Sequence, residues 1–552
     1  MNFSFLNNDL PNISTWESDD LDYNPFDLSG VQAYYPIYKL FSDYNPSNYN
    51  STFETNFTIA SPTHVMDSSN TLHEKPIFFK YGPLLDPCHY LIGKYKHQNH
   101  HMPCYSSEVT KINNIHNATY VDNFCYFLIS KILHSHNFFH AIDYYGSYLA
   151  YQKEYKIDII DDLEYIQGYD FFHENLSKLF HTSVFQHTQF NHHNSRKNKP
   201  VLNFDDNDND DLQLDFETLD ESTHDESIDG IELVYENDNM LSKSNHDNDD
   251  SDNSVISVSD DENDENDEND KDSENSDNDD SSTGDDLASE EVSSVEEEPL
   301  YAYIYNFPVQ MICMEKCEDT FDSLLHQDVL DEDSARSAIF QVIMILLSLQ
   351  KAFKFTHNDL HTNNIMYSKT DHEFIYYIYK DQVYKVPTFG RIFKIIDFGR
   401  AIYTFNNMVF CSDSFEEGGD GHGQYNTEPF FDSSKKRIDP NFSFDLCRLG
   451  CSIYDFVIDS EMSLNDMDGF QKLVVEWCTD DDGKNILYKK NGDERYPNFK
   501  LYKMIARLVH KHTPSKQLQN PFFQTYLDKG IPENTLTVLN LDEIPSYVES
   551  IH

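Results

Sequence analysis

A long acidic run divides this chain, because the segment from 201 to 299 has a composition that cannot build a folded core. Between positions 201 and 300, 39 residues are Asp or Glu and two are Lys, so this stretch carries −37 of the formal net charge of −57. Such a segment buries too little apolar surface to offset its conformational entropy. We therefore expect 201–299 to be a disordered insertion rich in Asp, Asn, Ser and Glu.

The net charge outside the acidic run limits the kinds of partner that the chain can bind. Outside the acidic run the net charge is −20, whereas binding to a nucleic-acid backbone requires clustered Lys and Arg. Nucleic acid is therefore excluded as the main partner. The acidic run itself is predicted to be a solvated segment, and two further hypotheses are docking of basic partners and phosphorylation of its serines.

Targeting and redox signals are weak along the whole chain. The amino terminus has no basic region followed by an apolar stretch, and the longest apolar stretch, Ala338 to Leu349, is too short to cross a bilayer. The nine cysteines are scattered without the spacing of a disulfide framework or zinc ribbon. We expect a soluble cytoplasmic protein with reduced thiols that is not secreted and has no membrane partner.

The chemistry concentrates in two short motifs of the carboxy-terminal part. The first is His357-Asn358-Asp359 with Asn364 five residues after the Asp, and the second is Asp397-Phe398-Gly399 after an apolar strand. Phosphoryl transfer from a nucleotide needs a carboxylate to accept the hydroxyl proton and oxygen ligands for Mg²⁺. These residues predict Asp359 as the base, with Asn364 and Asp397 as metal ligands.

Both motifs resemble the catalytic-loop and Asp-Phe-Gly signatures of protein kinases. The resemblance covers about 300–525 and implies a bilobal α+β fold with a small β-rich amino-terminal lobe and a mainly helical carboxy-terminal lobe. It also implies ATP and Mg²⁺ as cofactors. The implied order is a poorly defined extension (1–70), the first part of the small lobe (71–200), the acidic insertion (201–299), the last strand of that lobe with the hinge (300–317), and the large lobe (318–552).

The resemblance assigns further residues. Glu315 and Cys317 correspond to the hinge, where their backbone groups would bond the adenine. His357 belongs to the catalytic loop and is assigned, with Asp359 and Asn364, to the catalytic residues. The helix start at Asp445 resembles the element that braces this loop. Lys80, at the end of a β-like run, resembles the lysine that pairs with the phosphates, with Lys94 as the alternative.

Helical spacing of apolar residues predicts a helix over 120–133, which follows Lys80 in the chain. In that family an acid on this helix pairs with the lysine. Asp122 is the only carboxylate within the predicted helix, so Asp122 is the expected partner of Lys80.

Four departures from the family pattern bear on activity and substrate. No Gly-x-Gly-x-x-Gly occurs in the chain. Asn358 stands in place of the Arg that receives an activation-loop phosphate, which predicts competence without phosphorylation. His361 stands where protein kinases commonly have Lys, and this wording also resembles small-molecule phosphotransferases. The interval between Asp359 and Asp397 is about twice the usual one, and its surplus, 373–390, predicts a β-hairpin.

The expected function is ATP-dependent phosphorylation of Ser or Thr on a protein substrate. A small-molecule phosphotransferase of the same fold and a pseudokinase scaffold that binds partners remain open as alternatives. The divergent small lobe and the Asn- and Asp-rich tracts resemble protein kinases encoded by giant DNA viruses. That resemblance implies the host cytoplasm or the virion as the location.

Overall fold

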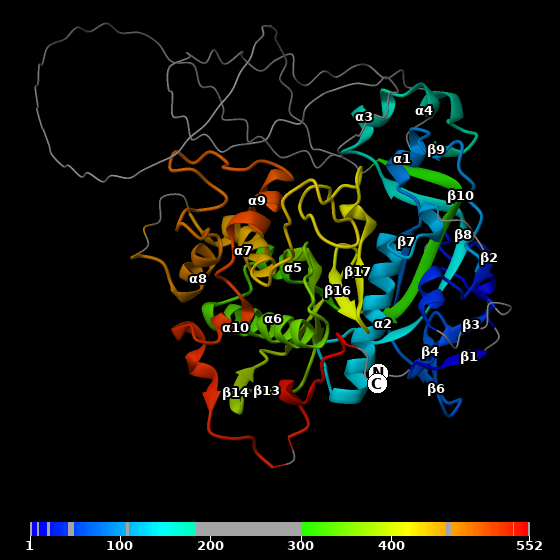
Figure 1. Cartoon of the computed structure of the whole chain (residues 1–552). Helices are drawn as coiled ribbons and strands as arrows, with labels where there is room; N and C mark the ends of the chain where they lie inside the picture. The colour runs from blue at the N-terminus through cyan, green and yellow to red at the C-terminus, as the bar shows by residue number, and fades with distance from the viewer. Residues whose placement is uncertain are drawn as a thin grey trace, which may run out of the picture. The chain divides into compact units, whose positions relative to one another are not determined.

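The computed structural model describes residues 3–183 and 300–549, apart from gaps at 8–9, 19–22, 42–48, 106–109, 460–462, 464 and 534. These residues form an α+β fold (Figure 1). The described residues belong to one compact unit. The acidic segment 201–299 lies outside the described residues, so the expected disorder stays a prediction.

The main sheet is assembled from segments on both sides of the acidic run. Its strand order is β2-β8-β10-β7, all neighbours are antiparallel, and β9 also pairs with β10. The two long strands β8 and β10 pair from Asp158↔Tyr301 to Tyr144↔Met314. The acidic run is thus an insertion between two strands of one sheet. The strands are β2 (Leu28–Gln32), β7 (Ile77–Pro83), β8 (Tyr144–Asp158), β9 (Phe180–Thr182) and β10 (Tyr301–Glu315).

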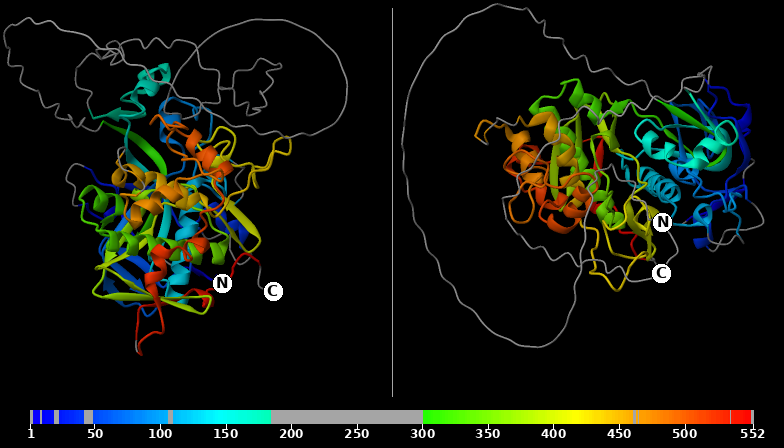
Figure 2. Two further views of the ribbon diagram at one scale, coloured as in Figure 1. Left: turned by 90° about the vertical axis from the view of Figure 1, so that its left-hand side faces the viewer. Right: turned by 90° about the horizontal axis from the view of Figure 1, so that it is seen from above.

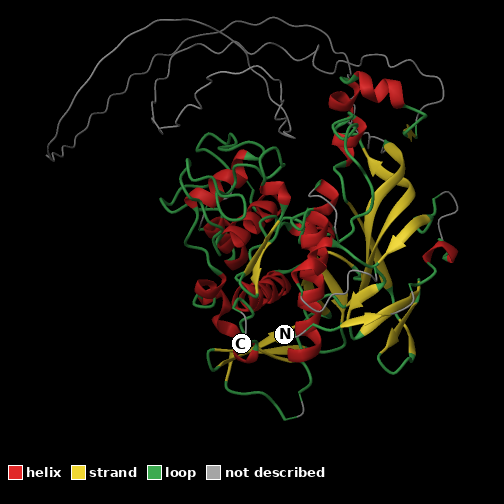
Figure 3. Ribbon diagram, turned by 45° about the vertical axis from the view of Figure 1, so that its right-hand side comes forward, coloured by secondary structure: helices red, strands yellow, loops and turns green. Residues whose placement is uncertain are grey.

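Helix α2 (Ala118–His136) packs beside this sheet (Figure 3). Asn117 caps its start by accepting a hydrogen bond from the Thr119 amide, and Asn137 ends it in the left-handed conformation with φ 52°. The helix extends beyond the predicted 120–133 at both ends. It contacts β8 and β10 as well as the later strand β17 (Met408–Cys411). Because α2 is covered from two directions, buried residues occur all around it.

The sequence predicts a poorly defined extension over 1–70, and the structure corrects this. Strand β2 extends the main sheet, and Trp16 and Phe26 are buried against Phe79 of β7, with ring centroids 5.8 and 5.0 Å away. Periodicity gives little sign of this, because the strands are short and the contacts are between distant segments. The other strands here are β1 (Phe5–Asn7), β3 (Ser51–Phe53), β4 (Phe57–Ser61), β5 (His64–Asp67) and β6 (Leu72–Glu74).

Helix α6 (Glu332–Phe353) is the core helix of the carboxy-terminal part. It has the length and apolar composition to cross a membrane, and 83% of its most apolar window is buried inside the protein. The burial identifies a core helix, since its apolar residues already have protein partners. The other helices of this part are α5 (Phe321–His326), α7 (Phe444–Val457), α8 (Gly469–Trp477), α9 (Lys500–Leu508) and α10 (Pro514–Gln517).

The predicted hairpin between the two motifs is confirmed. Strands β13 (Phe374–Tyr379) and β14 (Gln382–Pro387) pair antiparallel, and Lys380 and Asp381 form the turn with positive φ. The hairpin is joined by β18 (Leu527–Asp528) and, in parallel, by β19 (Val538–Asn540). Figure 2 shows the red carboxy-terminal segment beside the yellow-green hairpin. The surplus residues therefore build a four-stranded sheet with the end of the described chain.

Two short sheets and three short helices complete the described part of the fold. Strands β11 (Asp319–Thr320), β12 (Ile365–Lys369) and β15 (Arg391–Ile395) form one sheet, and β16 (Ile402–Phe405) pairs with β17. The segment from His357 to Asn364 thus precedes β12, and Asp397 follows β15. The short helices of the amino-terminal part are α1 (Pro87–Leu91), α3 (Leu163–Gln167) and α4 (Asp170–Asn175).

Candidate functional site

Helix α7 holds the loop that carries Asp359 through the side chain of Asp445. Asp445, at the start of that helix, accepts hydrogen bonds from the amides of His357 and Asn358, both at 2.9 Å. All three residues are fully buried. A buried carboxylate that accepts two backbone N–H groups holds the loop in one conformation. The predicted brace of the loop by Asp445 is confirmed.

Asn364 is oriented by the loop itself. Its Nδ2 donates to the carbonyl of Asp359 at 2.9 Å and lies 3.1 Å from Nε2 of His361. Both hydrogens of the amide are thus used, and Oδ1 accepts no hydrogen bond from the described residues. An amide oxygen held in this way is suited to a hard cation such as Mg²⁺.

Asp397 stands at the end of β15 in a left-handed backbone conformation, with φ 62°. Its amide donates to the hydroxyl of Tyr126 at 2.8 Å, and the amide of Phe398 donates to Oδ1 of Asp122 at 2.7 Å. Positive φ is uncommon for Asp and is retained where the surroundings enforce it. Two side chains of α2 therefore determine where the Asp397 carboxylate lies.

Lys80 connects the sheet, α2 and the Asp397 segment. Its Nζ lies 2.7 Å from Oδ2 of Asp122 and 2.8 Å from Oδ1 of Asp397. Burial opposes the charged ammonium, but the two carboxylates outweigh it and raise the pKa of Lys80. Lys80 in turn lowers the pKa of Asp397 to about 2. The contact of Lys80 with Asp122 that the sequence predicts is present, whereas the alternative Lys94 is exposed and does not line this site.

His357 lies behind the site rather than in it. It is fully buried, its Nε2 donates to the carbonyl of Ile396 at 2.9 Å, and its Nδ1 accepts from the amide of Asp359 at 3.3 Å. With both ring nitrogens engaged, the imidazole cannot reach a reacting group. The sequence prediction of a catalytic His357 is therefore corrected to a positioning role between the two motifs.

The two residues predicted for the hinge differ in what they offer. The amide of Glu315 donates to the carbonyl of Asp143 at 2.9 Å, and its carboxylate forms an ion pair with Lys394 at 2.7 Å. The amide of Cys317 has no acceptor among the described residues. Of the two N–H groups, that of Cys317 can donate to a ligand and that of Glu315 cannot.

Asn358, which replaces the Arg expected there, joins the loop to the segment after Asp397. It is buried with φ 66°, its Nδ2 donates to the carbonyl of Arg400 at 2.9 Å, and its Oδ1 accepts from the hydroxyl of Tyr425 at 2.9 Å. These neutral hydrogen bonds hold the two segments together with no charged group at this position.

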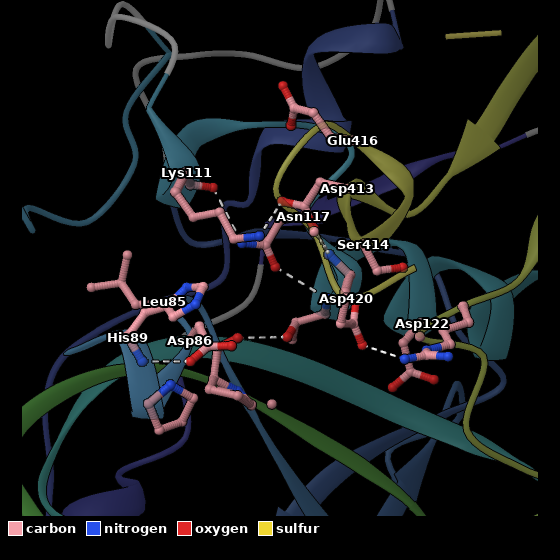
Figure 4. Close-up of a pocket in the computed structure, with 18 of the residues that line it drawn as sticks. Leu85, Asp86, His89, Lys111, Asn117, Asp122, Asp413, Ser414, Glu416 and Asp420 are labelled. Atoms are coloured by element: carbon pink, nitrogen blue, oxygen red, sulfur yellow. Dashed lines mark hydrogen bonds and ion pairs between the residues drawn. The ribbon is translucent and has the colours of Figure 1, made fainter. Parts of the chain in front are cut away.

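A cavity of about 560 Å³ lies beside Lys80, Asp359 and Asp397 (Figure 4). Asp413 borders it and lies at the start of α2, where Oδ1 accepts from the amide of Ala118 at 3.1 Å and Oδ2 pairs with Lys111 at 2.7 Å. A carboxylate is favoured at a helix amino terminus by the unpaired N–H groups there. The cavity is also lined by Lys80, Asp122, Asp359, Asp397, Arg400 and Asp420.

The described residues contain no group of three or more His, Cys, Asp or Glu that could hold a metal ion alone. Mg²⁺ commonly uses only one or two protein ligands, with phosphate and water oxygens completing its shell. The half-exposed carboxylate of Asp397 and the oriented Oδ1 of Asn364 fit that requirement.

Two residues of the site were not expected from the sequence. Asp413 is one, and Tyr502 of α9, whose hydroxyl donates to Oδ1 of Asp359 at 2.7 Å, is the other. Neither belongs to a motif, and Tyr502 is 143 residues away from Asp359. Only the amphipathic pattern of α9, which brings one helix face into the protein, gives an indirect sign of the latter.

The sequence matches no protein-family model and no curated protein. The geometry described above is therefore the basis on which a function can be proposed.

Proposed function

We propose that this chain is an ATP- and Mg²⁺-dependent protein kinase of the bilobal kinase fold, which transfers the γ-phosphate to Ser or Thr hydroxyls. The observation that carries the proposal is the position of Lys80 between Asp122 and Asp397. In a phosphotransferase of this kind, a lysine that pairs with a helix acid contacts the phosphates, and the Asp of the second motif binds the metal.

The fold supports the proposal through the order of its parts. Strand β7 with Lys80 is followed by α2, then by β8 and β10, and β10 leads into the segment with the free Cys317 amide. In the helical part, Asp359 and Asp397 line one cavity, and Asn364 is bonded to the carbonyl of Asp359. A single Lys–Asp contact is common in proteins, but this order of elements around it is much more specific.

Each residue has a defined task in the proposed reaction. Asp359 accepts the proton of the substrate hydroxyl, which becomes the nucleophile, and ADP is the leaving group. Lys80 would bind phosphate oxygens, and Asn364 and Asp397 would hold Mg²⁺, which supplies neutralisation of phosphate charge when bound. Catalysis rests on positioning and charge neutralisation, with no covalent enzyme intermediate.

A small sheet occupies the place before β7, where a Gly-rich loop would be expected. No glycine occurs between Gly30 and Gly82, and the place before β7 is occupied by the three-stranded sheet β4-β5-β6. Phosphate binding in this chain therefore depends on Lys80 and the metal ligands rather than on a flexible backbone loop. The buried network of Asn358 supports competence without activation-loop phosphorylation.

The test is transfer of radiolabelled phosphate from ATP with Mg²⁺ to basic and acidic protein substrates. Asp359→Asn and Asp397→Asn are expected to reduce transfer at least a thousandfold, whereas Asp158→Asn, an exposed carboxylate at the end of β8, leaves it unchanged. ATP·Mg²⁺ should still raise the melting temperature of Asp359→Asn but not that of Asp397→Asn.

A folded native chain that transfers no phosphate to any protein contradicts the proposal. Stabilisation by ATP without transfer would then favour the pseudokinase scaffold. Transfer to a small molecule instead would favour the small-molecule phosphotransferase. His361, which lies beside the base and whose pKa is lowered by burial, is compatible with that alternative.

A further inference from the structure

The hydroxyl of Tyr502 bonds one oxygen of the proposed base. Tyr502 lies on α9 (Lys500–Leu508), and its Oη donates to Oδ1 of Asp359 at 2.7 Å. This is the only side-chain hydrogen bond that the Asp359 carboxylate makes to the described residues. A general base must present a free lone pair to the proton that it accepts. Oδ2 of Asp359 is the oxygen that remains for this purpose.

Tyr502 is itself held in one orientation. Its ring stacks on Phe499 with centroids 5.3 Å apart and lies 6.2 Å from Phe444, and the guanidinium carbons of Arg448 and Arg400 lie 5.0 and 5.7 Å from its centroid. Burial raises the pKa of Tyr502, so the phenol keeps its proton and remains a donor. A hydroxyl that is fixed by packing can fix its acceptor in turn.

Helix α9 is anchored to the segment that borders the site. Arg507, five residues further along α9, donates from Nη2 to the carbonyl of Gly423 at 2.7 Å. The distance of Tyr502 from Asp359 is thus set by the fold and not by a mobile side chain alone. The position of the phenol is determined by the same segment that follows Asp397 in the chain.

His361 does not bond the carboxylate of Asp359, because it is engaged with Asn364. His361, two positions after the base, has its Nε2 3.1 Å from Nδ2 of Asn364. His361 therefore orients the metal ligand Asn364, and the carboxylate of Asp359 is left to Tyr502.

We propose that Tyr502 is a positioning residue for the proposed phosphoryl transfer. Its hydroxyl fixes Oδ1 of Asp359, so that Oδ2 is directed to the hydroxyl of the substrate. This inference rests on the proposed function and adds to it a residue that acts through Asp359. The opposite role, in which the phenol occupies the place of the substrate and blocks the base, predicts a change of activity with the opposite sign.

Tyr502→Phe removes only the hydroxyl and retains the packed ring. We expect kcat to fall about tenfold to a hundredfold, because a hydrogen bond to a charged group is lost in the transition state. KM for ATP and the melting temperature should stay unchanged. Tyr488→Phe is the matched control, since Tyr488 donates to the carboxylate of Asp455 at 2.8 Å outside the site, and its kcat should equal that of the native chain.

A double-mutant cycle separates positioning from a general structural effect. In single-turnover measurements, Tyr502→Phe should cost nothing further when Asp359 is already Asn, because the carboxylate that it positions is absent. An equal loss in both backgrounds overturns the inference, and so does an unchanged or higher kcat of Tyr502→Phe alone. A native chain without transfer activity contradicts the proposed function itself, and the inference with it.

Discussion

The ammonium group of Lys80 lies between two carboxylates, 2.7 Å from Asp122 and 2.8 Å from Asp397. The three residues come from a strand, a helix and a loop, and Lys80 and Asp397 are 317 positions apart in the chain. Asp122 also accepts the amide of Phe398. It thereby fixes both the lysine and the backbone next to the proposed metal ligand.

Substitution of Asp122 should separate its two tasks. Asp122→Ala leaves the amide of Phe398 without an acceptor and is expected to lower the free energy of unfolding by about 1–3 kcal/mol. Asp122→Asn can keep that acceptor and should recover most of the stability in urea unfolding. Both variants should lose about a hundredfold in kcat/KM, because Lys80 loses its partner. Native-like kcat/KM in Asp122→Asn would contradict the role given to the charge.

The two hydrogen bonds that Asp445 accepts should contribute more to the free energy of unfolding than an ordinary helix cap does. Asp445→Ala leaves two buried amides unpaired, those of His357 and Asn358, at about 1–3 kcal/mol each. Asp468→Ala, which removes the exposed cap of α8, should cost only about 1 kcal/mol. Chemical unfolding of the two variants measures the difference. Equal losses would mean that the loop does not depend on Asp445.

Phe78 should contribute to nucleotide binding through its exposed ring. Side chains alternate along a strand, so Phe78 shares a face of β7 with Lys80, while Phe79 points to Trp16 and Phe26 on the other face. Phe78 is 49% exposed although it pairs with Met314 next to the expected hinge. Stacking of a base on an aromatic ring is worth about 1–3 kcal/mol.

Phe78→Ala should therefore weaken binding of ATP about fivefold to a hundredfold and leave that of inorganic tripolyphosphate unchanged. Isothermal titration with each ligand provides the comparison. Phe389→Ala serves as the control, because Phe389 is 46% exposed in a turn remote in sequence from these residues. Equal effects of Phe78→Ala on both ligands would exclude stacking.

His140 predicts a loss of stability in acid. It is fully buried, with Nδ1 2.7 Å from the carbonyl of Phe393 and Nε2 2.7 Å from the hydroxyl of Tyr377, and burial lowers its pKa to about 3. Between pH 6.5 and 3 the unfolded chain binds a proton that the folded protein excludes. Stability must therefore fall as the pH is lowered through this window.

The expected loss from His140 is about 2 kcal/mol between pH 7.5 and 5, since each pH unit below 6.5 costs up to ~1.4 kcal/mol. Urea unfolding of His140→Gln should show a smaller dependence on pH than the native chain. His326→Gln, at an exposed position, should retain the native dependence. An unchanged pH dependence in His140→Gln would show that another group is responsible.

Local patterns were sufficient to predict part of this molecule. The hairpin around Lys380, the helix that carries Asp122 and the two motifs each lie in a contiguous segment, where spacing and turn residues carry the information. Tyr502 and Asp413 could not be found in this way. Each acts through a contact with a distant segment, and a Tyr in an amphipathic helix or an Asp in a loop has many commoner roles.

The first 70 residues illustrate the same limit. Strand β2 has five residues without regular alternation of buried and exposed positions, and its partner β8 lies more than 100 residues away. The burial of Trp16 against Phe79 likewise depends on tertiary packing. The predicted role of His357 was wrong for another reason, because a motif gives the spacing of residues and not the direction in which each side chain points.

Helix α2 is fastened to the segment after Asp397 at several points along its length, with Asp413 at its start and the Tyr126 hydroxyl on the amide of Asp397. A molecule that displaced Asp413 from the helix would also loosen the element that carries Asp122. By thermodynamic linkage, anything that tightens the Lys80 end must equally strengthen the hold on Asp413. The Asp413 end and the Lys80 end of the cavity are thus connected through α2, so a change at one end is expected to affect the other.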